Sequence, residues 1–382
     1  MKKNSGHMEP IELWYGLINS MMMEQGLFRD LKAVYEKNSP FIAEIIMNSF
    51  CPSKCQHCIY APDFHLYNKN LTQDEWKEAF RVIHDELGLN RFIFDGRAFT
   101  EQCIRAIEYL KENFGDVKVG LITDGISIGP FVERLIDFPP DWLDVSVDGL
   151  EKEHDLQRNH IGAFRKTFDV LIQLKDSNRF DKINILSCLT TLNIGSILEM
   201  IRFLNAKGFK NFFITPVSVL KGYRPDPDLQ PQREEFVNFL DEFLITSNTL
   251  FDTWLEVDIY EAIYANTIRQ LRPQLFNEFM MENDHLELVK AHGNNEVHIS
   301  YYPLSLTGVR EFIVNSDGNI IPPKVVAMGK IPREFVFGNL LELGGKEEKF
   351  DQLMSSQAFS FYMSELLSEK ALLGRDNGGI PG

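Results

Sequence analysis

The stretch FIAEIIMNSFCPSKCQHC, residues 41–58, decides how the fold of this chain is interpreted. It opens with a strand-like run, Phe41 to Asn48, and continues into a loop that carries Cys51, Cys55 and Cys58 in a C-x3-C-x2-C spacing. Three thiolates on one short loop can face a single metal centre, because sulfur ligation tolerates an irregular backbone and suits iron–sulfur clusters. The spacing therefore predicts a metal centre directly after the first strand.

Two other uses of these cysteines stay open. A zinc site needs a fourth ligand, which His57 or His65 can supply, although zinc sites more often combine a C-x2-C pair with a distant second pair. Disulfide bonds would leave one of the three unpaired, and the chain has only five cysteines in 382 residues, which disfavours an extracellular disulfide scaffold. A four-iron cluster with three protein ligands leaves one iron open to a cofactor, so it gives the missing fourth cysteine a chemical use.

The loop resembles the signature of the radical S-adenosylmethionine (SAM) superfamily, C-x3-C-x-(aromatic)-C after the first barrel strand, with His57 in the aromatic position. The resemblance implies that Cys51, Cys55 and Cys58 hold a [4Fe–4S] cluster whose fourth iron is chelated by S-adenosylmethionine, with His57 beside this cofactor. One-electron reduction then cleaves the sulfonium and yields a 5′-deoxyadenosyl radical. The implied partners are a small-molecule or peptide substrate and a small electron donor such as flavodoxin or ferredoxin.

Composition agrees with an enzyme of this kind. The length and a hydrophobic content of 44% suffice for a large domain with an appendage. A formal net charge of −16 argues against a nucleic-acid partner, whose phosphates need a basic surface. The sequence lacks an apolar run of roughly 18 residues and a signal-peptide pattern, so we expect no membrane association. Exposed thiolates fit a reducing cytoplasm.

Strand-like runs alternate with amphipathic helical stretches as far as about residue 217. Six such strands predict a parallel sheet, that is, an α/β fold with a partial (βα)6 TIM-like barrel and a smaller C-terminal α+β extension. One helix begins with Thr72 as N-cap and Glu75 three residues later, the pattern of a capping box. The expected strands are 41–48, 91–94, 118–122, 142–147, 184–189 and 211–214, and the expected helices between them are 72–83, 100–114, 131–136, 164–174 and 194–207.

The alternation stops beyond about residue 217, and a Pro-rich stretch, Tyr223 to Pro231, marks a boundary. The predicted organisation is an N-terminal helical segment (1–40), the barrel (41–217) and a substrate-covering extension (218–382). In the extension, residues 312–322 predict a β-hairpin with an Asp317-Gly318 turn. This hairpin resembles the extension called SPASM or twitch.

In relatives such an extension binds auxiliary clusters, but Pro322-Pro323-Lys324 stands where the expected cysteine would be. Three of the five cysteines belong to the first loop, which leaves only Cys103 and Cys188. We therefore predict one cluster and a C-terminal lid without an electron-relay role. Cys103 and Cys188 fit buried small hydrophobes, although an inward-facing Cys188 would be a catalytic hydrogen-atom donor in an epimerase.

Reactive groups of such barrels lie at the carboxyl ends of the strands. Asp95 and Gly96 end the second strand, where the family usually carries a Gly-Gly-Glu-Pro motif that binds the methionine amino group. Gly96 allows close backbone approach, and Asp95 is expected to contact the ammonium group. A plain turn is the alternative for Asp95.

Ser146 and Asp148 flank the end of the fourth strand on one face, which predicts that Ser146 reaches the cofactor carboxylate or ribose and Asp148 the substrate or a loop backbone. The stretch 154–158 resembles the family's loop between the fourth strand and its helix. There Arg158 is the first choice for a clamp on the methionine carboxylate, because a guanidinium fork binds carboxylates bidentately. A surface ion pair is the alternative.

On the later strands, Ser187 is expected to face inward beside the sulfonium, since it alternates with Leu186 and Cys188. Thr191 and Asn193 resemble a region of the family that often meets the ribose, while a helix N-cap is equally open for Asn193. Thr215, at the end of the sixth strand, is expected to line the adenine pocket.

Three functional hypotheses follow. The first is a radical enzyme that acts on a small polar metabolite by dehydrogenation, epimerisation or elimination. The second is a peptide-modifying enzyme, disfavoured because about forty residues before the first strand are few for a leader-peptide-binding domain. The third is a non-catalytic protein with a structural cluster or zinc. His154, His160, Glu256 and Asp258 are polar candidates that the sequence does not rank.

Overall fold

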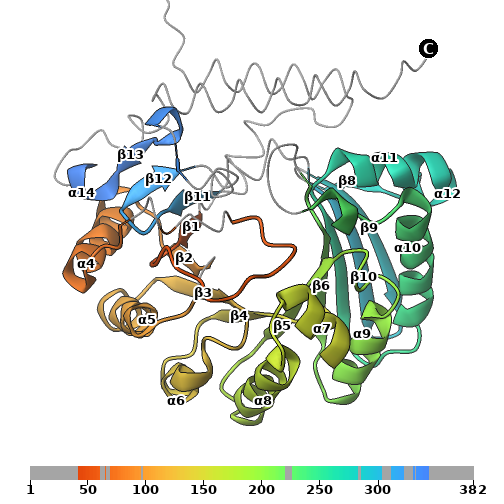
Figure 1. Ribbon diagram of the computed structural model, residues 1–382, viewed down its shortest axis with the longest axis horizontal. Coiled ribbons are helices and arrows are strands. Elements are labelled where there is room, and N and C mark those ends of the chain that lie inside the picture. Colours follow the sequence, from red (N-terminus) through yellow and green to blue (C-terminus); the bar gives the residue numbers. More distant parts are fainter. Residues whose placement is uncertain are drawn as a thin grey trace, which may run out of the picture.

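One curved sheet organises the protein. The computed structural model describes residues 42–60, 65, 69–95, 98–219, 226–282, 285–302, 311–321, 330–331 and 333–343. Their strands form a single thirteen-stranded sheet in the order β13-β12-β11-β1-β2-β3-β4-β5-β6-β7-β10-β9-β8. Figure 1 shows this sheet as an open curve with helices along its convex side. The predicted N-terminal segment, 1–40, lies outside the described residues.

The middle of the sheet confirms the predicted partial barrel. Six strands follow one another in chain order, and each is parallel to the next. They are β1 (Ile42–Ile45), β2 (Arg91–Phe94), β3 (Lys118–Thr123), β4 (Trp142–Ser146), β5 (Ile183–Leu189) and β6 (Asn211–Pro216). The helices that connect them are α4 (Gln73–Arg81), α5 (Glu101–Asn113), α6 (Val132–Asp137), α7 (Glu151–Arg158), α8 (Ala163–Asp176) and α9 (Ile197–Ala206).

Helix α4 begins as its sequence predicts. The Thr72 hydroxyl accepts from the backbone N–H of Glu75, and the Glu75 carboxylate accepts from the backbone N–H of Thr72, which completes the capping box. Trp76 and Phe80 are fully buried on the face turned to the sheet. Burial of each large apolar side chain stabilises the fold by about 1.5–3 kcal/mol. The helix continues into a π-helical turn, Val82–Glu86.

Alternation along the strands separates the hydrophobic core from an inner polar face. On β4, Leu143 and Val145 are fully buried, while Asp144 and Ser146 between them are half-buried. Successive strand residues point to opposite faces, so the apolar set packs under the helices and the polar set faces the inside of the curve. On β4 the concave face is therefore polar, while the register partners Ile122, Leu186 and Phe213 add apolar side chains to the same face of the neighbouring strands.

The sheet continues past β6, contrary to the expectation that the alternation ends near residue 217. Helix α10 (Arg233–Ser247) leads to β7 (Trp254–Ile259), which is parallel to β6. We missed this strand because Glu256 and Asp258 interrupt its apolar residues. After α11 (Ala262–Leu271) and α12 (Pro273–Phe276), the edge is completed by β8 (Met280–Glu282), β9 (His285–His292) and β10 (Asn295–Tyr301).

The opposite edge confirms the predicted hairpin. Strand β11 (Glu311–Val314) is parallel to β1 and antiparallel to β12 (Asn319–Ile321), with Gly318 in the turn at φ +81°. β13 (Gly338–Asn339) and α14 (Leu340–Leu343) follow. Segments beyond residue 217 thus border both edges of the barrel sheet. The domain boundary and the covering role of the extension stay predictions.

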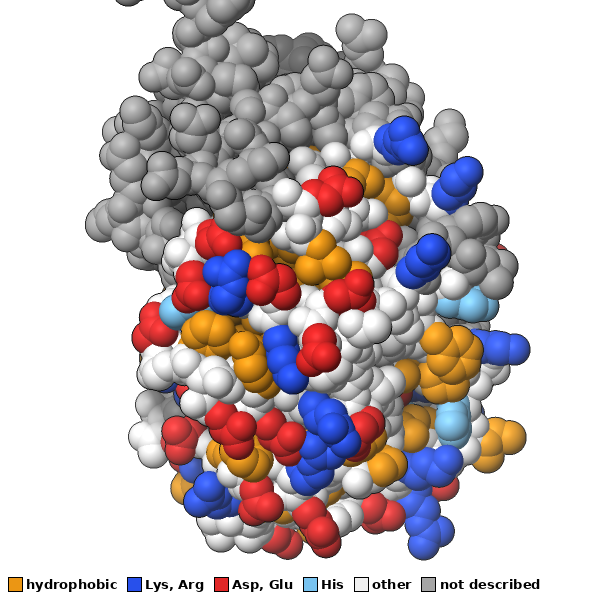
Figure 2. Space-filling view, turned by 90° about the vertical axis from the view of Figure 1, so that its left-hand side faces the viewer, with side chains coloured by type: hydrophobic (Ala, Val, Ile, Leu, Met, Phe, Trp, Pro, Cys, Tyr) orange, Lys and Arg blue, Asp and Glu red, His pale blue; other side chains and the backbone are white. Residues whose placement is uncertain are grey.

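The face in Figure 2 carries interspersed acidic and basic side chains. On the helices, Arg81 pairs with Glu78 at 2.7 Å, and Arg134 pairs with Glu101 and Glu108 at 2.8 and 2.6 Å. Pairs this exposed contribute little to stability, but they offset part of the acidic charge. Among the described helices, none combines the length and apolarity that a membrane span requires.

Candidate active site

Figure 1 shows the loop after β1 inside the curve of the sheet, and this loop carries the three predicted cysteine ligands. Cys51, Cys55 and Cys58 are all half-buried, and the backbone N–H of Cys58 donates to the carbonyl of Cys55 at 3.3 Å. Burial raises the pKa of Cys55 to about 11, and the negative charges of Cys58 and Cys51 act in the same direction. All three cysteines lie within eight residues of one loop, and the charges of the other two act on Cys55.

This donor set fits an iron–sulfur cluster. Across the described residues, no three Cys, His, Asp or Glu side chains converge as ligands of one metal ion. A cluster does not need that convergence, because each thiolate binds a different iron. Coordination also deprotonates a thiol outright, which overrides the raised pKa of Cys55.

The cysteine loop is anchored to α7. The backbone N–H of Gln56 donates to the carbonyl of Gln157 at 2.9 Å, and the Gln56 side chain donates to the carbonyl of Leu156 at 2.8 Å. The expectation of a loop at 154–158 was wrong, since these residues belong to a helix. The left-handed conformation of Asn159, at φ 51°, ends that helix just after Arg158.

Asp148 is the centre of a buried polar network behind the cysteines. It is fully buried, its Oδ2 lies 2.6 Å from Arg158 Nε, and its Oδ1 accepts from the backbone N–H of Cys188 at 2.9 Å. Burial tends to raise the pKa of Asp148, but the guanidinium of Arg158 and the neighbouring imidazoles lower it to about 2. A permanent carboxylate therefore joins the ends of β4, α7 and β5.

Arg158 connects this network to the cysteines. Its Nη1 lies 3.8 Å from the Cys55 sulfur, and only 9% of the residue is exposed. The guanidinium therefore does not form a surface ion pair, which was the alternative hypothesis. It is directed at the loop on which the cofactor is expected.

Two histidines border Asp148. His57 Nε2 lies 3.9 Å from Asp148 Oδ2, while its buried Nδ1 has no hydrogen-bond partner among the described residues. His154 accepts the backbone N–H of Asp148 on Nδ1 at 3.0 Å. Burial lowers the pKa of both imidazoles to about 4, so both are neutral at physiological pH. Sequence reasoning did not rank His154, because its partner is a backbone group.

The end of β5 contributes one half-buried thiol and one buried hydroxyl. Cys188 is half-buried, and burial raises the pKa of its thiol, with Cys58 and Cys55 among the charges acting on it. Ser187 lies on the opposite, buried face of the strand and donates to the carbonyl of Val147 at 2.5 Å. The structure therefore brings Cys188, but not the Ser187 hydroxyl, toward the cysteine loop.

Asn193 lies between the ends of β4 and β5. Its Nδ2 donates to the carbonyls of Asp148 and Cys188 at 2.7 and 2.8 Å, and the residue is fully buried. It is not a helix N-cap, because Ser196 holds that position at α9. Exposed Thr191 donates instead to the carbonyl of Asp228 at 2.9 Å.

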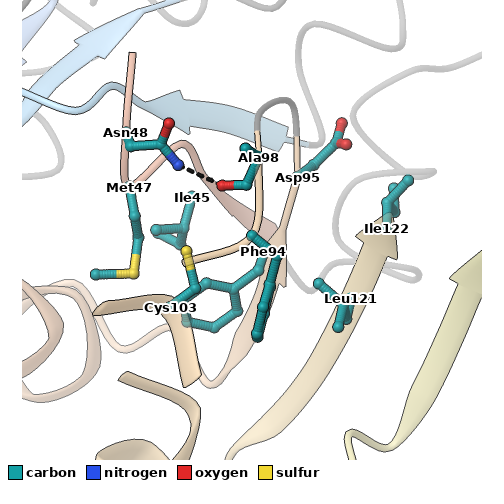
Figure 3. Close-up of a pocket in the computed structure, with 10 residues that line it drawn as sticks. Ile45, Met47, Asn48, Phe94, Asp95, Ala98, Cys103, Leu121 and Ile122 are labelled. Carbon is teal, nitrogen blue, oxygen red and sulfur yellow. Dashed lines mark hydrogen bonds between the residues drawn. The ribbon is translucent and has the colours of Figure 1, made fainter. Parts of the chain in front are cut away.

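The other predicted residues lie at neighbouring strand ends. Ser146 and Thr215 are half-buried on the inner faces of β4 and β6, and Thr215 is the register partner of Cys188. Asp95 lies at the rim of a small pocket between the ends of β1, β2 and β3 and the start of α5 (Figure 3). Asn48 crosses that pocket and donates to the carbonyl of Ala98 at 2.5 Å. Gly96 lies outside the described residues.

A polar wall, which sequence reasoning did not rank, covers the inner face of β7 and β10. Glu256 is buried, accepts from the Trp254 indole at 2.9 Å and lies 3.5 Å from the Ser300 hydroxyl. Burial and the charge of Glu256 raise the pKa of Asp258 well above its ordinary value. His298 stacks on Trp254 with ring centroids 3.9 Å apart. The alternation of acids in WLEVDI (254–259) was the signal for this wall.

Comparison with known proteins agrees with this geometry. Residues 45–204 match the profile of the Radical SAM superfamily. Native anSMEcpe with bound AdoMet aligns with a TM-score of 0.57 at 16% identity, over 85% of this chain and 83% of that one. Streptococcus suis SuiB bound to its precursor peptide SuiA aligns with a TM-score of 0.59 at 12% identity, over 95% and 75%. At these identities the two structures show a shared fold. No curated protein matches the sequence.

The profile match extends from the last residue of β1 into α9 and contains the whole cysteine loop. Residues 45–204 therefore form a radical SAM domain, as the cysteine spacing predicts, and the protein is an enzyme. The cofactors of this superfamily are a [4Fe–4S] cluster and S-adenosylmethionine. The likeness of the C-terminal region to SPASM stays a prediction.

Proposed function

We propose that this radical SAM enzyme abstracts a hydrogen atom from a small polar metabolite and thereby starts a dehydrogenation, epimerisation or elimination. The observation that carries the proposal is a set of acidic and hydroxyl side chains on the inner face of the barrel. Asp144 on β4 is half-buried, and burial raises its pKa to about 6. Across the curve, Glu256, Asp258 and Ser300 form the polar wall. Such groups bind hydroxyl and amino groups.

In this proposal, Cys51, Cys55 and Cys58 hold the [4Fe–4S] cluster. When bound, the cluster and S-adenosylmethionine supply a 5′-deoxyadenosyl radical by one-electron cleavage of the sulfonium. The protein holds the cysteine loop in place through Gln56 and α7 and shields it with the carboxylate and imidazoles around Asp148.

Residues around the loop are proposed to hold S-adenosylmethionine. Arg158 is expected to attract the methionine carboxylate, because its buried cation is directed at this loop. His57 is expected to contact the cofactor through its free Nδ1. Asp95 is expected to contact the ammonium group. The further expected contacts with the ribose and adenine are Gly96, Ser146, Thr191 and Thr215, whereas the buried side chains of Ser187 and Asn193 bind backbone carbonyls and are not available to the cofactor.

Cys188 is proposed as the hydrogen-atom donor if the net reaction is an epimerisation. Burial raises the pKa of its thiol, so the S–H bond that would be broken is intact at neutral pH. After the thiol gives a hydrogen atom to the substrate radical, one electron from the flavodoxin- or ferredoxin-type donor and one solvent proton restore it. A Cys188→Ala variant should then still form 5′-deoxyadenosine but lose the epimerised product.

The test of radical chemistry is anaerobic reconstitution with iron and sulfide, followed by dithionite reduction in the presence of S-adenosylmethionine. Wild type should bind about four irons per chain and form 5′-deoxyadenosine. A variant with Cys51, Cys55 and Cys58 replaced by alanine should do neither. Bound zinc without cleavage would refute the proposal and favour the non-catalytic hypothesis.

A peptide substrate is the second candidate. It is favoured by the shared fold with SuiB bound to its precursor peptide and with anSMEcpe bound to AdoMet and the Cp18Cys peptide, which aligns with a TM-score of 0.55 at 16% identity. Extracts from cells grown in D2O separate the two candidates. Deuterium should enter 5′-deoxyadenosine from the small-metabolite fraction, whereas transfer from the peptide fraction alone would favour a peptide maturase.

A further inference from the structure

We propose that Arg158, oriented by Asp148, donates a hydrogen bond to the sulfur of Cys55 and raises the reduction potential of the cluster on this loop. Arg158 and Asp148 act in this inference as positioning residues. The inference rests on the proposed function, because it requires Cys55 to be a cluster ligand.

The contact joins two distant parts of the chain. Arg158 Nη1 lies 3.8 Å from Cys55 Sγ, and the two residues are 103 positions apart in the sequence. A hydrogen bond to sulfur is longer than one to oxygen, so this distance is a direct contact. Because Arg158 is buried, its charge acts on the sulfur with little screening by water.

Asp148 determines which guanidinium nitrogen faces the sulfur. Its Oδ2 holds Nε of Arg158 at 2.6 Å, while its Oδ1 is fixed by the backbone N–H of Cys188 at 2.9 Å. The planar guanidinium cannot turn independently of Nε, so this attachment directs Nη1 to Cys55.

The charges next to the loop are few. His57 and His154 border Asp148 at 3.9 and 3.0 Å. Arg158 is the cation in contact with Cys55 and Asp148 is the anion behind it, while the charge of Asp124 also acts on Arg158. No other charged side chain is hydrogen-bonded to Arg158 or Asp148 in the part of the chain that the structure describes.

The sign of the effect follows from these positions. Reduction adds one negative charge to the cluster, so the cation of Arg158 stabilises the reduced form and the carboxylate of Asp148 opposes it. Hydrogen bonds to cluster sulfurs also raise the potential. Removing each charge separately should therefore shift the potential in opposite directions.

The experiment is a potentiometric titration of the reconstituted full chain, followed by the EPR signal of the reduced cluster without S-adenosylmethionine. Arg158→Gln should shift the midpoint to more negative values, and Asp148→Asn should shift it to more positive values. Arg158→Lys, which keeps the charge but loses the fork, should shift it less than Arg158→Gln. The control is Lys152→Gln, which removes an exposed cation from the same helix and should leave the midpoint unchanged.

The outcomes separate this inference from the proposed function. A wild-type protein that does not bind about four irons refutes the proposed function. Normal iron content with an unchanged midpoint in Arg158→Gln, or with equal shifts in the glutamine and lysine variants, refutes the inference. Shifts of the same sign in Arg158→Gln and Asp148→Asn refute it too, since a general disturbance of the loop would produce them. If the Asp148→Asn variant does not bind iron, the comparison of the midpoints of Arg158→Gln and Arg158→Lys tests the inference by itself.

Discussion

Replacing Asn193 with alanine is expected to destabilise the ends of β4 and β5. The side chain is fully buried and bridges these strands, because its Nδ2 donates to the carbonyls of Asp148 and Cys188 at 2.7 and 2.8 Å. Its Oδ1 accepts from the backbone N–H of Thr190 at 2.8 Å. Alanine removes all three interactions and brings no new partner.

The magnitude follows from the groups left without a partner. The carbonyl of Cys188 keeps a second donor, Gln157 Nε2 at 2.8 Å, whereas the carbonyl of Asp148 and the N–H of Thr190 lose the bonds that Asn193 makes. A buried polar group without a partner costs about 1–3 kcal/mol, so the variant should lose about 3 kcal/mol of unfolding free energy. With an unfolding entropy of about 2.1 cal/mol/K per residue, the thermal midpoint should fall by roughly 4 °C.

The assay is thermal unfolding of the apo-protein, followed by tryptophan fluorescence. The matched control is Asn248→Ala, whose side chain makes one exposed bond of 3.3 Å to the carbonyl of Leu244, and which should change the unfolding free energy by less than about 0.5 kcal/mol. Asn193→Asp should lose more than the alanine variant, because its carboxylate faces two carbonyls. A midpoint for Asn193→Ala equal to that of the control would show that the bridge does not stabilise the fold.

Three further predictions concern packing, capping and pH. Gly120→Ala would place a methyl group 2.1 Å from the Trp142 ring, so the variant should lose about 1–3 kcal/mol of unfolding free energy, measured by thermal unfolding. The control is Gly195→Ala, whose methyl group meets no atom within 4 Å and should be nearly neutral. Equal thermal midpoints for the two variants would contradict the packing argument. Thr72→Ala removes the capping box of α4 and should cost about 1 kcal/mol in urea titration, and no change would show that Glu75 alone caps the helix. Burial lowers the pKa of His154 from 6.5 to about 4, so its stabilisation is complete above pH 6.5 and is lost as the pH falls toward 4. The loss of unfolding free energy should be about 2 kcal/mol at pH 5. On acidification, the thermal midpoint of His154→Gln should therefore fall less than that of the wild type. Parallel falls of the two midpoints with pH would refute this prediction.

The periodic parts of the fold were predictable from the sequence. The capping box at Thr72 and the hairpin turn at Asp317-Gly318 were confirmed, because each depends on residues close in the chain. Strand β2, Arg91–Phe94, was expected at its observed bounds. Strand β7 was missed because Glu256 and Asp258 face the inside of the barrel, where a strand is not apolar on both faces.

The candidate site also has one part that the sequence predicts and another that it does not. Its cysteine loop was predictable, because three ligands within eight residues form a local pattern with a specific chemistry. The roles of Asp148 and Asn193 were not, since their partners are backbone groups 40 and 45 positions away. The type of a residue does not reveal which backbone group its side chain will contact. The register of the sheet determines that partner.

The sequence by itself determined the class of chemistry and the order of the barrel strands, because the cysteine spacing and the hydrophobic periodicity are properties of neighbouring residues. Only the tertiary structure decided that Arg158 contacts Cys55 across 103 positions, that Ser187 lies on the buried face of β5, and that later strands extend the sheet at both edges. These features depend on burial and long-range pairing, which arise when distant segments share one core.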